Sequence, residues 1–227
     1  MKNLLIVCAT LLAGCGAGGS ADKGGQASTA SFPLKAGLTA RVASGSTETF
    51  NVSGTCTGSA TFTRSAATAS TFEGKASLET VQSVEVEFAD CTPASNSASG
   101  TDHVDANLVP LGSSVPDVEY SVLLKVPAPL PTSVKVGDAG EYATLATYTD
   151  SSKAVATGQR VFSFVVEADT ANTAIVNLTM KSYDAATQLL FTQQSRHRIA
   201  ADGSLTLVSI DVQFSTTGSN HQIYTRT

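Results

Sequence analysis

The sequence predicts an all-β protein made of antiparallel meander sheets that form a sandwich or a partly open barrel. Apolar and polar residues alternate with a period of two over many segments, including 118–126 and 174–181, which is typical of strands with one buried face. Short turn-forming segments separate these strands, whereas parallel strands need long crossovers. Together these features favour antiparallel pairing throughout.

Four parts are expected along the chain. Residues 1–14 form a signal peptide, and residues 15–33 contain a cysteine, Cys15, and a Gly/Ser/Ala-rich tether. Residues 34–115 form an N-terminal β region with a disulfide, and residues 116–227 form a C-terminal antiparallel β meander. The two β regions either are separate subdomains or share one core.

In the first β region, residues 84–88 alternate as a strand, and only residues 76–84 have a weak helical pattern. Residues 92–102 form a polar loop. Residues 126–140 contain three of the seven prolines, so this segment leaves the sheet or follows its edge.

The C-terminal meander contains strands at 162–167, 174–181, 189–199 and 205–215. The sequence Ala-Asp-Gly-Ser at 201–204 predicts a hairpin with a type I′ turn between the last two. Alternation in the last strand places Val208, Ile210, Val212 and Phe214 on one face.

The N-terminal segment predicts where in the cell the protein is located. Its apolar run, residues 4–12, is shorter than the roughly 20 residues that span a membrane, so it predicts a signal peptide. The sequence Leu12-Ala13-Gly14-Cys15 resembles the lipobox of bacterial lipoproteins. That resemblance implies that signal peptidase II cuts before Cys15, and that Cys15 carries lipid on its sulfur and an acyl chain (palmitate) on the new N-terminus. By the same resemblance, Gly16 favours the outer membrane. The alternative is an ordinary secretory signal that contains a cysteine.

Two cysteines remain for the folded part. Cys8 lies in the apolar run and Cys15 takes the lipid, which leaves Cys56 and Cys91. Because an exported location is oxidising, we expect these two to form a disulfide. It would close a loop of about 36 residues, for which chain entropy gives roughly 3–4 kcal/mol of stabilisation. No metal site is expected, since two sulfurs without a nearby histidine are a poor zinc site.

Three stretches carry a wider resemblance: "VSGTCTGSATFT", "SVKVGDAGEYATLATYTDSSKAVATGQ" and "VVEADTANTAIVNLTMKSYD". They resemble a family of uncharacterised proteobacterial lipoproteins over most of residues 45–227. The resemblance agrees with the lipoprotein assignment and transfers no functional residue.

Composition argues against several functions. The net charge of −5 becomes about −6 without Lys2, and basic residues are scattered, so nucleic-acid binding lacks its electrostatic signature. Dinucleotide-binding, P-loop and zinc-protease motifs are absent, and no cofactor is expected.

Few residues suggest catalysis, and no catalytic residue is assigned. The sequence contains three histidines, His103, His197 and His221, which we interpret as exposed polar residues. The segment "TDHVDAN" at 101–107 offers metal ligands but matches no calcium loop. Arg196 and Arg198 share one strand face and offer a site for an acidic group, or simply face solvent. "GTCTG" at 54–58 has the spacing of a hydrolase elbow but lacks the helix that must follow it.

We therefore expect a non-enzymatic, lipid-anchored envelope protein that acts in structure or binding, with the membrane and envelope proteins as partners. One alternative is a carrier whose concave face, at 162–166, 174–180 and 208–214, encloses an apolar ligand or lipid. In the simpler interpretation these residues fill the core. The sequence also leaves open an envelope hydrolase that uses His103 or His197, and a surface adhesin.

Overall fold

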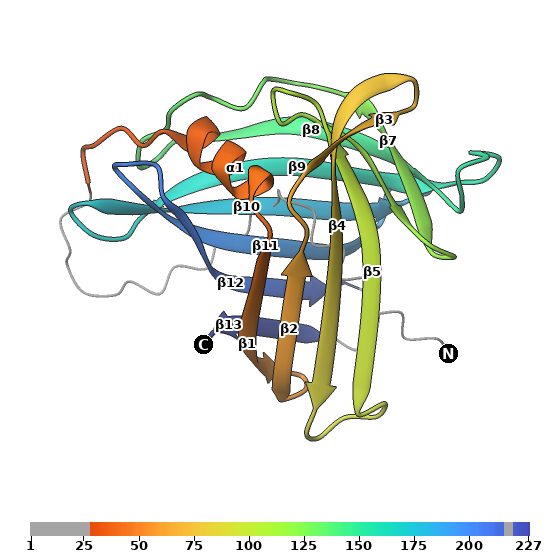
Figure 1. The fold of residues 1–227 in the computed structure, drawn as a ribbon. Helices are drawn as coiled ribbons and strands as arrows, with labels where there is room; N and C mark the ends of the chain where they lie inside the picture. The colour runs from red at the N-terminus through yellow and green to blue at the C-terminus, as the bar shows by residue number, and fades with distance from the viewer. Residues whose placement is uncertain (1–27, 216–219) are drawn as a thin grey trace.

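The computed structural model describes residues 28–215 and 220–227, and these form one helix and thirteen strands (Figure 1). The elements are α1 (Leu34–Ala43), β1 (Ser46–Gly54), β2 (Gly58–Arg64), β3 (Thr68–Phe72), β4 (Lys75–Phe88), β5 (Ser95–Val104), β6 (Pro110–Val115), β7 (Glu119–Lys125), β8 (Ala139–Tyr148), β9 (Ala156–Ala168), β10 (Thr173–Asp184), β11 (Leu189–Ala200), β12 (Leu205–Phe214) and β13 (His221–Arg226). The all-β prediction is confirmed. The signal peptide, Cys15 and most of the predicted tether lie outside the described residues.

The strands form a closed antiparallel barrel. Consecutive strands from β4 to β13 pair in order, β13 pairs with β1, and β1 forms a hairpin with β2. The ring of twelve strands closes where β2 pairs with β4, with Gly58 opposite Phe88. β3 pairs with the other part of the same β4 edge and lies outside the ring. β6 and β7 pair on either side of residue 116, so the sheet is continuous there.

The core lies between two crossing parts of this sheet. In Figure 1, β1, β2, β4 and β5 run steeply across β8–β12, as in orthogonal packing. The inward side chains of β9 and β10 are buried, and Phe162, Leu178 and Met180 among them are completely so. Across the barrel, Phe50, Phe62 and Tyr224 pack edge to face, with ring centroids 5.0 and 5.4 Å apart.

Helix α1 was not predicted, because its sequence is a weak helix former. Gly37 and the β-branched Val42 lower helix propensity, and no side chain caps its N-terminus. Tertiary packing compensates, since Leu34, Leu38 and Val42 are buried. A Cβ on Gly37 would lie 2.5 Å from the Gly203 carbonyl oxygen, so the close approach of α1 to the β11–β12 turn requires glycine.

The segment with the weak helical pattern, residues 76–84, lies within β4 instead. Within the described residues, no helix combines the length and apolar character needed to cross a membrane.

The β11–β12 hairpin lies where it was predicted, but with another turn and register. The amide of Gly203 donates to Ala200 and that of Ala200 to Ser204. Within the turn only Gly203 has a positive φ, +86°, so the loop is a three-residue type I turn with a glycine bulge. Further along, His197 pairs with Leu207 and Arg196 with Ser209. This shift in register is a second bulge, in which Val208 is the extra residue. Leu207 therefore takes the place of Val208 on the buried face.

The predicted disulfide is confirmed. Cys56 and Cys91 are bonded, with their Cα atoms 5.8 Å apart. Cys56 lies just before β2 and Cys91 just after β4, next to the pairing of Gly58 with Phe88. Beside them the amide nitrogen and hydroxyl of Thr57 donate to the Asp90 carboxylate at 2.7 and 2.9 Å. The bond therefore fastens one end of the β2–β4 seam that closes the barrel.

Candidate functional site

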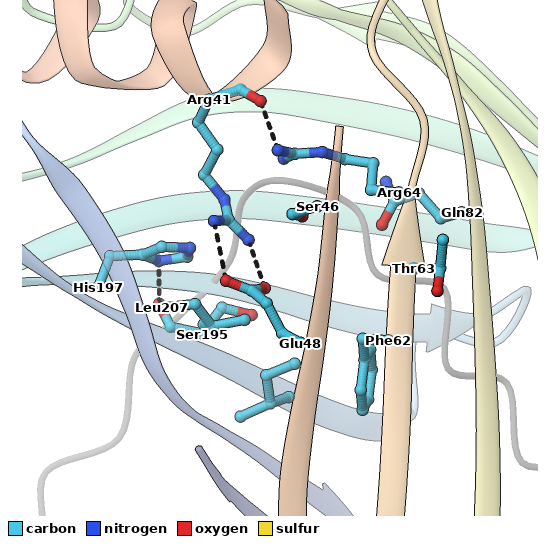
Figure 2. A pocket seen from close by; sticks show the side chains of 11 residues that line it. Arg41, Ser46, Glu48, Phe62, Thr63, Arg64, Gln82, Ser195, His197 and Leu207 are labelled. Atoms are coloured by element: carbon cyan, nitrogen blue, oxygen red, sulfur yellow. Dashed lines mark hydrogen bonds and ion pairs between the residues drawn. The ribbon is translucent and has the colours of Figure 1, made fainter. Parts of the chain in front are cut away.

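A small pocket with charged lining residues lies inside the barrel beneath α1 (Figure 2). Its volume is about 40 Å³. It is bounded by α1 and by strands from opposite sides of the barrel, β1, β2 and β4 facing β11 and β12. Its lining consists of Arg41, Ser46, Glu48, Phe62, Thr63, Arg64, Gln82, Ser195, His197, Leu207 and Ile210. Charged and hydrogen-bonding side chains thus lie on the inward faces of the strands, where the alternating pattern predicts apolar residues.

An ion-pair network crosses the pocket. The Arg41 guanidinium, at the last turn of α1, forms a forked pair with buried Glu48, with distances of 3.1 and 3.4 Å. Arg226 approaches the same carboxylate at 3.3 Å. Arg64 donates to the carbonyls of Arg41 and Ser44, the carbonyl end of α1, where a cation is favoured. These contacts join the helix to β1 and β2.

His197 completes the other wall of the pocket. Its Nδ1 lies 3.1 Å from the Ser195 carbonyl oxygen. Because a carbonyl only accepts hydrogen bonds, Nδ1 carries the proton and Nε2 keeps its lone pair. Burial, reinforced by the positive charge of Arg41, lowers the pKa of His197 to about 3, so the ring is neutral at pH 7.

A second buried charge cluster adjoins the first through Gln82. The Gln82 amide donates to the carboxylate of Asp102. Burial raises the pKa of Asp102 to about 7, although Arg160 and Arg64 both act to lower it. Fully buried Arg160 pairs with Glu119 at 2.8 Å, and burial raises the pKa of Glu119.

The interpretation of His103 and His197 as exposed residues is wrong. They are 7% and 3% exposed, because His103 packs under the β3 hairpin and the bulge at Val208 sets His197 opposite Leu207. His103 stacks on Phe72 with 4.3 Å between ring centroids. His221 is partly exposed and bonds Asp211 at 2.9 Å.

The candidate metal ligands of residues 101–107 do not converge. Asp102 faces the barrel interior beside Gln82, whereas the adjacent His103 faces the other side of β5, since successive strand residues alternate. Asp105 accepts bonds from the amides of Asn107 and Val109 and closes a turn. Cys56, Cys91 and Asp90 also lie together, but the two sulfurs are bonded to each other and offer no thiolate.

Arg196 and Arg198 face outward, as one of the two interpretations expected. Arg196 pairs with Glu167, and Arg198 pairs with Asp169 at 2.7 Å. Acidic side chains at the end of β9, on the far side of β10, therefore already occupy this pair of arginines.

Sequence reasoning missed the charged lining of the pocket, although a signal was present. Glu48 shares its strand face with Phe50 and Val52, and Arg64 shares its face with Phe62 and Ala60. A charge on the apolar face of an alternating strand indicates a buried polar partner. Comparisons with protein-family models, with curated proteins and with solved structures found no match.

Proposed function

We propose that the protein is a lipid-anchored module of the bacterial cell envelope that acts in structure or binding, not in catalysis. The sequence Leu12-Ala13-Gly14-Cys15, directly after a short apolar run, carries this proposal. Residues 16–31 would link the lipid to the barrel, and sixteen residues reach roughly 50–60 Å when extended. Two or three acyl chains would hold the anchor firmly, whereas one gives marginal binding.

The hydrolase alternative receives no support from the histidine geometry. Both Ser77 Oγ, at 3.4 Å, and Glu79 Oε2, at 3.9 Å, approach the same Nδ1 atom of His103. A proton relay needs the nucleophile and the acid on different ring nitrogens. At His197 the bonded nitrogen faces a main-chain carbonyl, which cannot act as the orienting carboxylate of a triad.

The carrier alternative is also disfavoured. The inward residues of 162–166, 174–180 and 208–214 are buried members of one apolar cluster, as the filled-core interpretation expects. The pocket beneath α1, about 40 Å³, is small beside the ~300–1,000 Å³ of typical ligand sites. A lipid would require the core to open.

Lipid attachment is tested by labelling cells that express the full chain with a palmitate analogue. We expect label on the wild type and on Cys8→Ser, but none on Cys15→Ser. Both variants remove one thiol from the same N-terminal segment, so they are matched. Label that persists in Cys15→Ser, or its absence from the wild type, would contradict the anchor.

A further inference from the structure

The pocket beneath α1 contains more positive than negative charge. Arg41 and Arg64 both line it, and Glu48 is the one carboxylate among the described lining residues. That carboxylate is already shared between Arg41 and Arg226. Arg41 and Arg64 are largely buried, so water screens their charge poorly.

Arg64 in particular lacks a carboxylate partner. Its guanidinium bonds two main-chain carbonyls, and among the described residues no carboxylate lies within 4.0 Å of it. The Nε atoms of Arg41 and Arg64 are buried without hydrogen-bond partners. Burial, reinforced by the charge of Arg41, lowers the pKa of Arg64 to about 10, although Glu48 and Asp102 act to raise it. A bound anion would relieve this imbalance.

The size and chemistry of the pocket select the anion. One water needs roughly 10–15 Å³, so a cavity of about 40 Å³ holds about three atoms of that size. Guanidinium groups match planar carboxylates in fork geometry. Half-exposed Ser46 and exposed Thr63 lie at the rim of the pocket. The part of a ligand beyond its carboxylate would extend into solvent there.

We propose that this pocket binds the carboxylate group of a small organic acid or of a peptide C-terminus, with Arg64 as the principal cation. The residues of the site belong to α1 and the barrel strands, so the proposal goes beyond the envelope assignment and does not depend on the lipid. Failure of the palmitate experiment and failure of this one are therefore distinguishable.

The test compares thermal unfolding of the purified full chain in sodium acetate and in sodium chloride, at pH 7 and equal ionic strength. A ligand that binds only the folded state raises Tm as its concentration exceeds Kd. We expect Tm to rise with acetate and to stay lower in chloride. Equal Tm values in the two salts would overturn the proposal.

Matched variants separate site binding from general salt effects. Arg64→Gln should weaken acetate binding about tenfold or more, the effect of losing one charge-assisted hydrogen bond. Arg198→Gln removes the same charge on the outer face, where Arg198 pairs with Asp169, and should keep the acetate response. An unchanged response in Arg64→Gln would overturn the proposal.

A wild-type measurement keeps the test valid if Arg64→Gln does not fold. In NMR spectra, added acetate should shift two arginine Nε–H signals to saturation, and chloride should not. The source of the carboxylate is then distinguished with acetyl-dialanine. Tighter binding of its free acid than of acetate, with none of its amide, would indicate a peptide terminus, whereas acetate alone would indicate a small acid. No shift with any of these probes would overturn the proposal.

Discussion

The barrel interior contains an apolar region around Phe162, Leu178 and Met180 and a charged region around Glu48, Arg64 and Asp102. The apolar region is stabilised by contact area, which has no direction and requires only shape. The charged region is stabilised only when each group has its partner, because an unpaired buried charge costs several kcal/mol. The first region therefore explains why the barrel is stable, and the second is where a specific ligand would be recognised.

The largest expected effect comes from breaking the apolar region. Phe162→Ala should lower the free energy of unfolding by about 3–5 kcal/mol, from lost burial and the cavity that remains. Urea denaturation measures it, with Leu124→Ala, at a position 60% exposed, as a control that should change by less than about 0.5 kcal/mol. A loss below about 1 kcal/mol would mean that Phe162 is not packed, and would revive the carrier alternative.

The next largest loss of stability is expected from a substitution in the charged region. Glu48→Gln keeps the shape but leaves Arg41 and Arg226 without their shared carboxylate, and breaking such a pair costs about 3 kcal/mol. The control is Glu141→Gln, whose exposed pair with Lys125 spans 3.7 Å and is expected to contribute at most about 1 kcal/mol. Equal stability of the two variants would show that the Glu48 network does not stabilise the fold.

Much of the apolar region could be predicted from the sequence. Alternation at 162–166 and 174–180 indicates strands and their buried face directly, because the side-chain period of two is local. The pairing of Cys56 with Cys91 follows from elimination. Barrel closure could not be predicted, since the β2–β4 and β1–β13 pairings join segments far apart or out of order in the chain.

The charged region was harder to predict for a different reason. Helix α1, which supplies Arg41, has a sequence of weak helix propensity and is stabilised by tertiary packing. The bulge at Val208 shifts the strand alternation by one residue and thereby sets the face opposite His197. Only Glu48 and Arg64 carried a local signal, a charge in line with apolar neighbours, and reading it correctly requires the partner strand.

Two titrating groups of the charged region, Asp102 and His197, act in opposite directions on stability. Asp102, whose pKa rises from 3.8 to about 7 on folding, keeps its proton in the folded state and so stabilises it as pH falls from about 7 towards 4. His197, whose pKa falls from 6.5 to about 3, stays neutral when folded, so stability is lost as pH falls from about 6.5 towards 3. Each group contributes at most about 1.4 kcal/mol per pH unit, and in the wild type the two largely cancel.

In the wild type the two opposite dependences of the free energy of unfolding on pH largely cancel. Single variants should therefore separate them. Between pH 6.5 and 4.5, Asp102→Asn should lose stability by roughly 1 kcal/mol per pH unit, because the effect of His197 is then no longer offset by Asp102. His197→Gln should gain stability over the same range, because the effect of Asp102 is then no longer offset by His197. Urea denaturation in buffers free of carboxylates measures both, since a carboxylate buffer would itself occupy the proposed site. Parallel pH profiles for the two variants would show that these groups titrate normally and that the region is wetter than its burial indicates. Opposite slopes would establish that the charged region is dry, which is the condition under which Arg64 has most to gain from a bound anion.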